Sequence, residues 1–351
     1  MPGRPDSDPP ASREVSWAIR VRVPASSANL GPGFDSVGLA LGVWDEYVVA
    51  VTDEPGLRID LAGDAQGVPR DERHLVYASM RRAWQELCVE APPGLILHCA
   101  NVIRQGRGMG SSAAAIVAGV AAAHAIAGGP GASDRVALDL DAVNDLAGRL
   151  EGHPDNASAS VYGGATISWV DDAQGVAGGV EPPPERRRPG PAISVHSESI
   201  PLHRDIEPLV LVPQVQLPTA TARAVLPAQV PHGQAALNSA RAGLLVLALS
   251  ARPALLLPAT REWLHQEQRR SSFGGAMELV DELRAAGHAA VISGAGPSVL
   301  VLTGDRAARH ADVARRAPEG WEVLRPGIPH QGVCVERVTL EELPGERALP
   351  A

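Results

Sequence analysis

Residues 106–128 read GRGMGSSAAAIVAGVAAAHAIAG, with glycines at three alternate positions and two serines ahead of an alanine-rich run. Glycine adopts left-handed backbone conformations freely, so this spacing lets successive N–H groups turn inward around an anion. A helix that begins at Ser111 or Ser112 would add its N-terminal dipole, and we expect one of these serines to cap it. A second interpretation stays open, a glycine turn that leads into a buried alanine helix.

This loop differs from the two common nucleotide-binding loops. All 31 basic residues of the chain are arginine, so the lysine of G-x-x-x-x-G-K-[ST] is missing, and no lysine can serve as a general base or form a Schiff base. The spacing of Gly106, Gly108 and Gly110 also differs from G-x-G-x-x-G, so a dinucleotide-binding fold is not supported. An anion in this loop would therefore be held by backbone amides.

The composition limits the class of protein. A length of 351 residues predicts two domains. The net charge of −9 argues against nucleic acid or an anionic membrane surface as a partner and favours small molecules. Three scattered cysteines suit reduced thiols, the N-terminal residues lack a signal-peptide core, and the apolar runs are too short to span a bilayer. We expect a cytoplasmic protein.

Residue periodicity predicts a mixture of strands and helices without regular βαβ alternation, which favours the α+β class. We expect helices at 74–88, 134–150, 234–250 and 277–286, besides the one after residue 112. We expect strands at 18–26, 45–52, 57–63, 94–101, 165–170, 192–197, 208–213, 289–294 and 298–302.

The domain organisation is predicted from a long stretch rich in proline, glycine and charge that follows residue 170. We expect a disordered tail at 1–16, an N-terminal domain at 17–170, a linker at 171–191, a C-terminal domain at 192–340 and a tail at 341–351.

Two further segments end strands in glycine turns: VPASSANLGPGFD at 23–35 and SGAGPSVL at 293–300. Taken in order with residues 106–112, they resemble the three signature motifs of the GHMP kinases. The longer stretches VPASSANLGPGFDSVGLALGVWDE, residues 23–46, and EGHPDNASASVYGGATIS, residues 151–168, are similar to homoserine kinases in particular. The resemblance extends from about residue 19 to about residue 302.

The resemblance implies an α+β fold of two domains. The N-terminal domain would be like a domain of a ribosomal small-subunit protein, with a left-handed βαβ crossover, and the C-terminal domain would be ferredoxin-like. ATP would lie between them. Homodimers are common in the family, so a homodimer is one option for this chain, although no residue identifies an interface.

The implied reaction transfers the γ-phosphoryl group of ATP to the side-chain hydroxyl of L-homoserine, with Mg²⁺. By similarity, Ser112 would bind Mg²⁺ together with Asp145, and Glu151 is the alternative carboxylate. The triphosphate would be wrapped by Gly106, Arg107, Gly108, Met109, Gly110, Ser111 and Ser112.

The resemblance also assigns an amino-acid site. Asn29 and Asp35 would bind the ammonium and hydroxyl groups of homoserine. Arg223 and Arg269 would bind its carboxylate through forked guanidinium donors, although adjacent arginines such as 269 and 270 are commonly surface residues. The remaining substrate contacts implied are His153, Thr219 and Gly294.

The implied catalytic residues are Asn156, Asp155 and Arg223. We expect a tight polar turn at EGHPDN, because proline forces an extended backbone at His153. Asn156 would hold the attacking hydroxyl, and Asp155 is a candidate base. Phosphoryl transfer develops little proton transfer in its transition state, so positioning by an asparagine can suffice.

Some positions depart from the family pattern. Arg104 stands where proline usually precedes the loop, Met109 replaces a leucine of similar volume, Pro218 precedes Thr219, and Gln234 replaces an aspartate. The charge lost at Gln234 leaves open a paralogue that acts on another small hydroxylated amino acid or alcohol. A nucleotide-binding sensor without turnover is a third alternative. No G-x-S-x-G elbow or dinucleotide fingerprint supports acyl transfer or redox chemistry.

Overall fold

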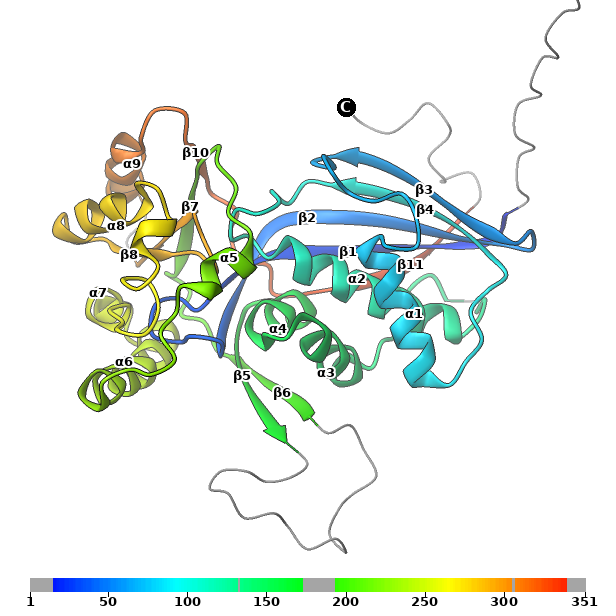
Figure 1. The fold of residues 1–351 in the computed structure, drawn as a ribbon, viewed down its shortest axis with the longest axis horizontal. Helices are drawn as coiled ribbons and strands as arrows, with labels where there is room; N and C mark the ends of the chain where they lie inside the picture. Colours follow the sequence, from blue (N-terminus) through cyan, green and yellow to red (C-terminus); the bar gives the residue numbers. More distant parts are fainter. Residues whose placement is uncertain (1–14, 132, 173–192, 305–306, 340–351) are drawn as a thin grey trace, which may run out of the picture.

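Figure 1 shows the computed structural model of the protein, which describes residues 15–131, 133–172, 193–304 and 307–339. The predicted tail 341–351 lies outside these residues, as do most of the predicted tail 1–16 and most of the predicted linker 171–191. The strands form one sheet of seven strands and one of four, and helices pack on both, as the α+β prediction requires.

The seven-stranded sheet has the order β11-β1-β2-β4-β3, with β5 paired to β2 and β6 paired to β5. All its neighbours are antiparallel except β3 and β4, which are parallel and joined through helix α1 (Leu75–Leu87). This βαβ unit is present where it was expected, and its handedness stays a prediction. The strands are β1 (Val15–Ala28), β2 (Val37–Thr52), β3 (Gly56–Gly63), β4 (Gly94–Asn101), β5 (Ala165–Asp172), β6 (Ile193–Ile200) and β11 (Cys334–Val338).

Helices α1, α2 (Ser111–Ala127), α3 (Leu140–Glu151) and α4 (Pro154–Tyr162) lie together beside this sheet (Figure 1). Most residues of α2 are buried, because its alanines let α1 and β1 approach closely. A Cβ atom at Gly119 would lie 2.3 Å from the carbonyl oxygen of Val76 in α1. The buried alanine helix of the second interpretation is therefore present together with the glycine loop.

The four-stranded sheet is antiparallel, with the order β10-β7-β9-β8. Numbered within this unit, the order is 4-1-3-2, and the connections run β-α-β-β-α-β, which is the ferredoxin-like arrangement that was expected. Its elements are β7 (Glu207–Val212), α5 (Thr219–Ala224), α6 (His232–Ser250), α7 (Leu256–Ala259), α8 (Ala276–Ala285), β8 (Ala289–Ile292), β9 (Val299–Thr303), α9 (Ala307–Arg316) and β10 (Glu322–Leu324), with 3-10 turns at Pro253–Leu255 and Arg270–Ser272.

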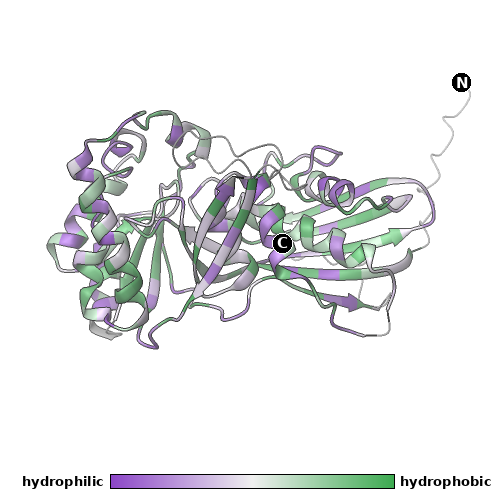
Figure 2. Ribbon diagram, turned by 90° about the horizontal axis from the view of Figure 1, so that it is seen from below, coloured by the Kyte–Doolittle hydropathy of each residue, from purple (hydrophilic) through white to green (hydrophobic). Residues whose placement is uncertain are grey.

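The two sheets do not coincide with the two predicted segments of the chain. Strands β6 and β11 fall within residues 192–340 but pair with the first sheet. One hydrophobic cluster also continues from β1 and α2 into β7, α6 and β9. Figure 2 shows hydrophobic residues along the strands of both sheets. None of the helices in the described ranges is long and apolar enough to cross a membrane.

One sequence expectation about local structure was wrong and a second was confirmed. The helix expected at 134–150 begins only at Leu140, where the side chain of Asp139 caps it by accepting from the N–H of Ala142 at 3.0 Å. The preceding residues instead run beside β11, and the N–H of Val136 donates to the carbonyl of Val335. The expected turn at EGHPDN is present as the short link between α3 and α4, with an extended backbone at His153 as expected. Pro154 occupies the first helical position of α4, where a missing N–H costs no hydrogen bond.

Candidate active site

Three glycine-containing segments that are distant in sequence meet at one cavity. The N–H of Ser26, near the end of β1, donates to the carbonyl of Met109 at 3.1 Å. The hydroxyl of Ser293, after β8, donates to the carbonyl of Gly108 at 2.6 Å. The cavity between them is lined by Ala28, Asn29, Arg104, Gly106, Gly108, Met109, Gly110, Ser111, Ser112, Glu151, His153, Asp155, Asn156, Leu217, Thr219, Arg223, Arg269, Gly294 and Ala295.

The loop before α2 has the backbone that an anion nest requires. Gly106, Gly108 and Gly110 have φ values of +62°, +69° and +70°. A Cβ atom at Gly108 would lie 2.1 Å from the carbonyl oxygen of Ser293, so a side chain there has no room. This backbone confirms the conformation that the glycine spacing predicted.

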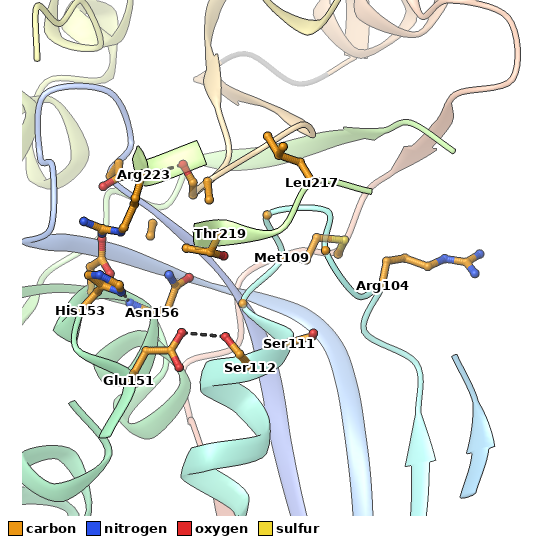
Figure 3. A pocket seen from close by; sticks show the side chains of 18 of the residues that line it. Arg104, Met109, Ser111, Ser112, Glu151, His153, Asn156, Leu217, Thr219 and Arg223 are labelled. Atoms are coloured by element: carbon orange, nitrogen blue, oxygen red, sulfur yellow. Dashed lines mark hydrogen bonds between the residues drawn. The ribbon is translucent and has the colours of Figure 1, made fainter. Parts of the chain in front are cut away.

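The expected serine cap of α2 is wrong. The N-cap residue is Gly110, and no side chain caps the helix. The first N–H groups of a helix have no partner within it, so these amides remain available to a ligand in the cavity. Ser112 instead turns its hydroxyl to Glu151 and donates to Oε1 at 2.7 Å (Figure 3).

The two candidate metal carboxylates lie in different surroundings. Asp145 does not line the cavity, because it accepts from Nε of Arg149 at 3.1 Å and from the N–H of Val195 at 2.8 Å. Glu151, at the end of α3, does line it and faces Ser112. Burial raises the pKa of the Glu151 carboxyl, and the hydrogen bond from Ser112 opposes that shift. The geometry therefore favours the alternative, Glu151.

The start of α4 brings Asp155 and Asn156 into the cavity. The hydroxyl of Ser26 donates to Oδ1 of Asn156 at 3.0 Å, which leaves the Nδ2 group as the donor for a ligand. Asp155 is 1% exposed, and burial, followed by the charge of Asp35, raises the pKa of its carboxyl to about 7. Figure 3 shows Asn156 between the side chains of Ser112 and Arg223.

The opposite part of the cavity holds two arginines. Both terminal nitrogens of Arg223, from α5, donate to the carboxylate of Asp35. Arg269 is 1% exposed, and among the described residues its Nε has no hydrogen-bond partner. Burial lowers the pKa of the Arg269 guanidinium to about 10, so it stays charged at neutral pH. The expectation that adjacent arginines are surface residues fits only its neighbour Arg270, whose Nε lies 2.7 Å from Oε1 of Glu267.

The other predicted site residues divide into two groups. His153 and Thr219 line the cavity, and Gly294 accepts a hydrogen bond from Nδ2 of Asn29 at 3.0 Å. Arg107 does not line it, because its guanidinium donates to the backbone carbonyls of residues 105, 213 and 214. Its side chain thus ties the loop to the segment after β7.

Sequence reasoning missed four residues that support the site: Ser26, Phe34, His265 and Ser293. Ser26, Phe34 and Ser293 lie inside the glycine-containing segments, so their position was a usable signal. Nothing around His265 distinguished it. Among the departures from the family pattern, Arg104 pairs with Glu322 at 3.2 Å and extends away from Ser112 (Figure 3), and Met109 is buried.

Comparison with known proteins gives this site a family. The description "GHMP kinases N terminal domain" matches residues 74–164, and "GHMP kinases C terminal" matches residues 246–321. Homoserine kinase from Streptomyces avermitilis is 48% identical over 320 residues, covering 91% of this chain and 95% of that protein. The chain belongs to the homoserine kinase family. Within this family, homoserine kinase from Streptomyces coelicolor is 46% identical over 319 residues, covering 91% and 94%.

Solved structures agree with the fold of a GHMP kinase. Homoserine kinase from Cytophaga hutchinsonii superposes with a TM-score of 0.74 at 24% identity, over 92% of this chain and 99% of that one. Mevalonate kinase from L. major superposes with a TM-score of 0.59 at 15% identity, over 90% and 98%. At these identities the likeness concerns the fold alone. The predicted fold class is confirmed, and the enzyme is a kinase.

Proposed function

We propose that this kinase transfers the γ-phosphoryl group of ATP to the side-chain hydroxyl of L-homoserine, giving O-phospho-L-homoserine for threonine biosynthesis. One observation supports this most strongly. A single cavity has an uncapped helix N-terminus with a glycine loop at one end and two arginines at the other, one of which, Arg223, pairs with Asp35 outside the lining. The first end suits a polyphosphate, and the second suits a zwitterionic amino acid.

The nucleoside has a place next to the loop. A second cavity of about 240 Å³ shares Ser111 and Ser112 with the first. Its lining combines apolar and aromatic side chains, including Tyr47 and Val68, with polar ones such as Asn101 and Gln105. With the phosphates on the amides of residues 106–112, the base and ribose would extend into this second cavity.

The proposed magnesium site consists of Ser112 and Glu151. No group of three or more histidine, cysteine, aspartate or glutamate side chains in the described ranges could hold a metal ion alone. Mg²⁺ is commonly bound by one or two protein oxygens together with substrate phosphates and water. The Ser112–Glu151 pair beside the loop fits that mode, and the bound ion would neutralise charge on the phosphates.

The amino-acid substrate would bind by its two charges. Arg269, which is buried without a hydrogen-bond partner at Nε, and Arg223 would take the carboxylate, while Asp35 and Asn29 would take the ammonium group. The side-chain hydroxyl would then point toward Asn156 and the loop. Gln234 lies in the first turn of α6 and is not among the residues that line the cavity, so its change from the family pattern does not touch this arrangement.

The chain's own residues supply positioning and a proton acceptor. Asn156 is fixed by Ser26, so its Nδ2 would hold the attacking oxygen in line with the γ-phosphorus. Asp155, with its pKa near neutrality, would accept the proton when the oxygen attacks. Replacing Asn156 by alanine should lower kcat by roughly 100-fold or more and leave the KM for ATP nearly unchanged. Normal turnover of this variant would remove Asn156 from the mechanism.

A coupled ADP-release assay tests the proposal. The enzyme with Mg-ATP is offered homoserine, serine, mevalonate and galactose, and phosphorylated product is confirmed by mass spectrometry. We expect turnover with homoserine at a kcat/KM at least about 100-fold above that with the other three, because none of them places its hydroxyl and both charges in the same way. A preference for another alcohol would favour a paralogue, and ATP binding without any product would favour a sensor.

Three further expectations stay with this proposal. We infer that the enzyme acts in the cytoplasm, which its three unpaired cysteines suit. A homodimer is one option. We also keep the division into an N-terminal domain at 17–170 and a C-terminal domain at 192–340, which would enclose ATP between them. Strands β6 and β11 belong to the second of these segments but pair with strands of the first sheet.

A further inference from the structure

The aromatic ring of Phe34 contacts both arginines of the amino-acid site. The guanidinium carbons of Arg223 and Arg269 each lie 5.5 Å from the centroid of the ring. The ring also stacks on the imidazole of His265, with centroids 4.9 Å apart and planes 21° from parallel. One side chain therefore touches three positively charged or protonatable groups from two segments of the chain, Arg223 in α5 and the neighbouring turn that carries His265 and Arg269.

The turn that carries Phe34 is anchored on both sides. The Nε2 atom of His265 lies 2.9 Å from the carbonyl oxygen of Gly31, and Nδ2 of Asn238 donates to the carbonyl of Pro32 at 2.9 Å. His265 is fully buried, and the carboxylate of Glu262 accepts from its backbone N–H at 2.9 Å. Hydrogen bonds from two other segments therefore fix the backbone of the turn that carries the ring.

The two arginines need such a support because they are like charges at one end of the cavity, where Arg269 is buried and the side chain of Arg223 is 28% exposed. Asp35 pairs with Arg223 alone, and each arginine has a buried Nε that lacks a hydrogen-bond partner among the described residues. The face of an aromatic ring is electron-rich, so it attracts a guanidinium and offsets part of the cost of its burial. Without the ring, repulsion would move the two guanidinium groups apart or toward solvent.

We propose that Phe34 is a positioning residue for carboxylate recognition, which holds Arg223 and Arg269 together so that both reach one carboxylate of the substrate. This inference rests on the proposed function, because it assigns the substrate's carboxylate to these arginines. Phe34 does not line the cavity that contains the glycine loop and Asn156, so we expect its effect to be confined to substrates that carry a carboxylate. It thereby contributes to the choice of amino acids over plain amino alcohols.

The test replaces Phe34 by leucine and by methionine, which keep apolar volume but remove the ring, and by tyrosine, which keeps it. The chain contains one other phenylalanine, Phe273, which is buried next to Gly296. The cation–π contacts of Arg223 and Arg269 are with Phe34, so Phe273→Leu is the matched control. Folding of each variant is checked by circular dichroism and thermal melting. Two variants without the ring keep the test valid if one of them does not fold.

For Phe34→Leu and Phe34→Met we expect the KM for homoserine to rise about tenfold, with kcat and the KM for ATP within about twofold of wild type. The inhibition constant of 3-aminopropan-1-ol, which is homoserine without its carboxylate, should also stay within about twofold. Phe34→Tyr should retain the KM of wild type.

Equal weakening of homoserine and 3-aminopropan-1-ol would overturn the inference, since the ring would then act on the whole site. An unchanged KM for homoserine in the leucine and methionine variants would overturn it as well, and so would a Phe273→Leu variant with the same selective loss. A wild-type enzyme that does not phosphorylate homoserine would overturn the proposed function instead, which the assay without any substitution reveals first.

Discussion

The two ends of the active-site cavity bind negative charge by different means. At residues 106–112 the backbone supplies N–H groups, and the loop's single charged side chain, Arg107, is turned to backbone carbonyls outside the cavity. At the other end, Arg223 and Arg269 supply guanidinium groups that rest on Phe34. Anion binding at the first end depends on which positions of the loop lack a Cβ atom. Anion binding at the second end depends on the residues that pack against the arginine side chains. Substitutions should therefore affect the two ends in different ways.

The largest effect should follow from Gly108→Ala. An added Cβ atom would meet the carbonyl of Ser293 at 2.1 Å in a backbone with φ of +69°, so the loop must move away from the turn that follows β8. Because a displacement of about 1 Å can cost about 100-fold in rate, we expect kcat/KM for ATP to fall by at least that factor. Steady-state kinetics check this.

Gly287→Ala is the control for this substitution. Gly287 also has a positive φ, of +88°, but no atom lies within 4 Å of the added Cβ. Its variant should lose stability without losing activity at low temperature. Equal activity losses in the two variants would mean that backbone strain alone, rather than the position of the loop, explains the result.

A smaller effect is expected from Arg269→Lys at the other end. Lysine keeps the charge but loses the planar fork that can hold a carboxylate by two hydrogen bonds. We expect the KM for homoserine to rise roughly 30-fold, with the KM for ATP unchanged. Arg270→Lys is the matched control, because the neighbouring side chain pairs with Glu267 outside the cavity and should change neither constant.

Glu151→Gln should distinguish the two candidate metal carboxylates. If Glu151 and Ser112 bind Mg²⁺, the Mg²⁺ concentration for half-maximal activity should rise about tenfold in this variant. Asp145→Asn should leave the Mg²⁺ requirement unchanged and lower the melting temperature, because Asp145 holds Arg149 and the backbone of β6. The opposite pattern in a magnesium titration would restore Asp145 as the ligand.

The pH dependence should report Asp155, where the two ends meet. With a pKa of about 7, its carboxyl is mostly protonated at pH 6, so kcat/KM should be several-fold to about tenfold lower at pH 6 than at pH 8. Asp155→Asn should have low activity without this acidic limb. A limb that persists unchanged in Asp155→Asn would assign it to another group.

The same carboxyl should also affect stability. Because its pKa is raised in the folded state, the fold keeps a proton that the unfolded chain releases, so Asp155 lowers the free energy of unfolding as pH rises from about 4 to about 7. Melting temperatures of wild type and Asp155→Asn, compared at about pH 5 and pH 7.5, measure this contribution. The melting temperature of wild type should fall relative to that of Asp155→Asn as the pH rises from about 5 to about 7.5.

The features that the sequence predicted well are those with local causes. Apolar residues recur at helical spacing through residues 74–88 and alternate with polar residues through 57–63, and both elements formed as expected. The glycine spacing at residues 106–110 likewise predicted the backbone of the loop. Most residues named for the site line one cavity, because the signature motifs end the strands and helices that surround it.

What the sequence left open or predicted wrongly has long-range causes. Asp145 and Glu151 are both acidic residues on one helix, and only the packing of α3 against β6 shows that the first is occupied by Arg149 and Val195. Ser112 looked like a helix cap until its partner Glu151, 39 residues away, was placed beside it. The residues ahead of α3 have helical spacing but pair with the end of the chain near Val335. Local patterns carry no information about such partners.

Strand β11 has a consequence for how the enzyme is made. It pairs with β1 across residues 334–338, although more than 300 residues separate the two strands in sequence. A ribosome that has completed the glycine loop and both arginines still has an open edge on β1, with unpaired backbone groups that invite association with other chains. Strand β11 covers this edge and follows every residue of the active site in sequence, so a product truncated before it would retain the whole site and still expose the edge of β1.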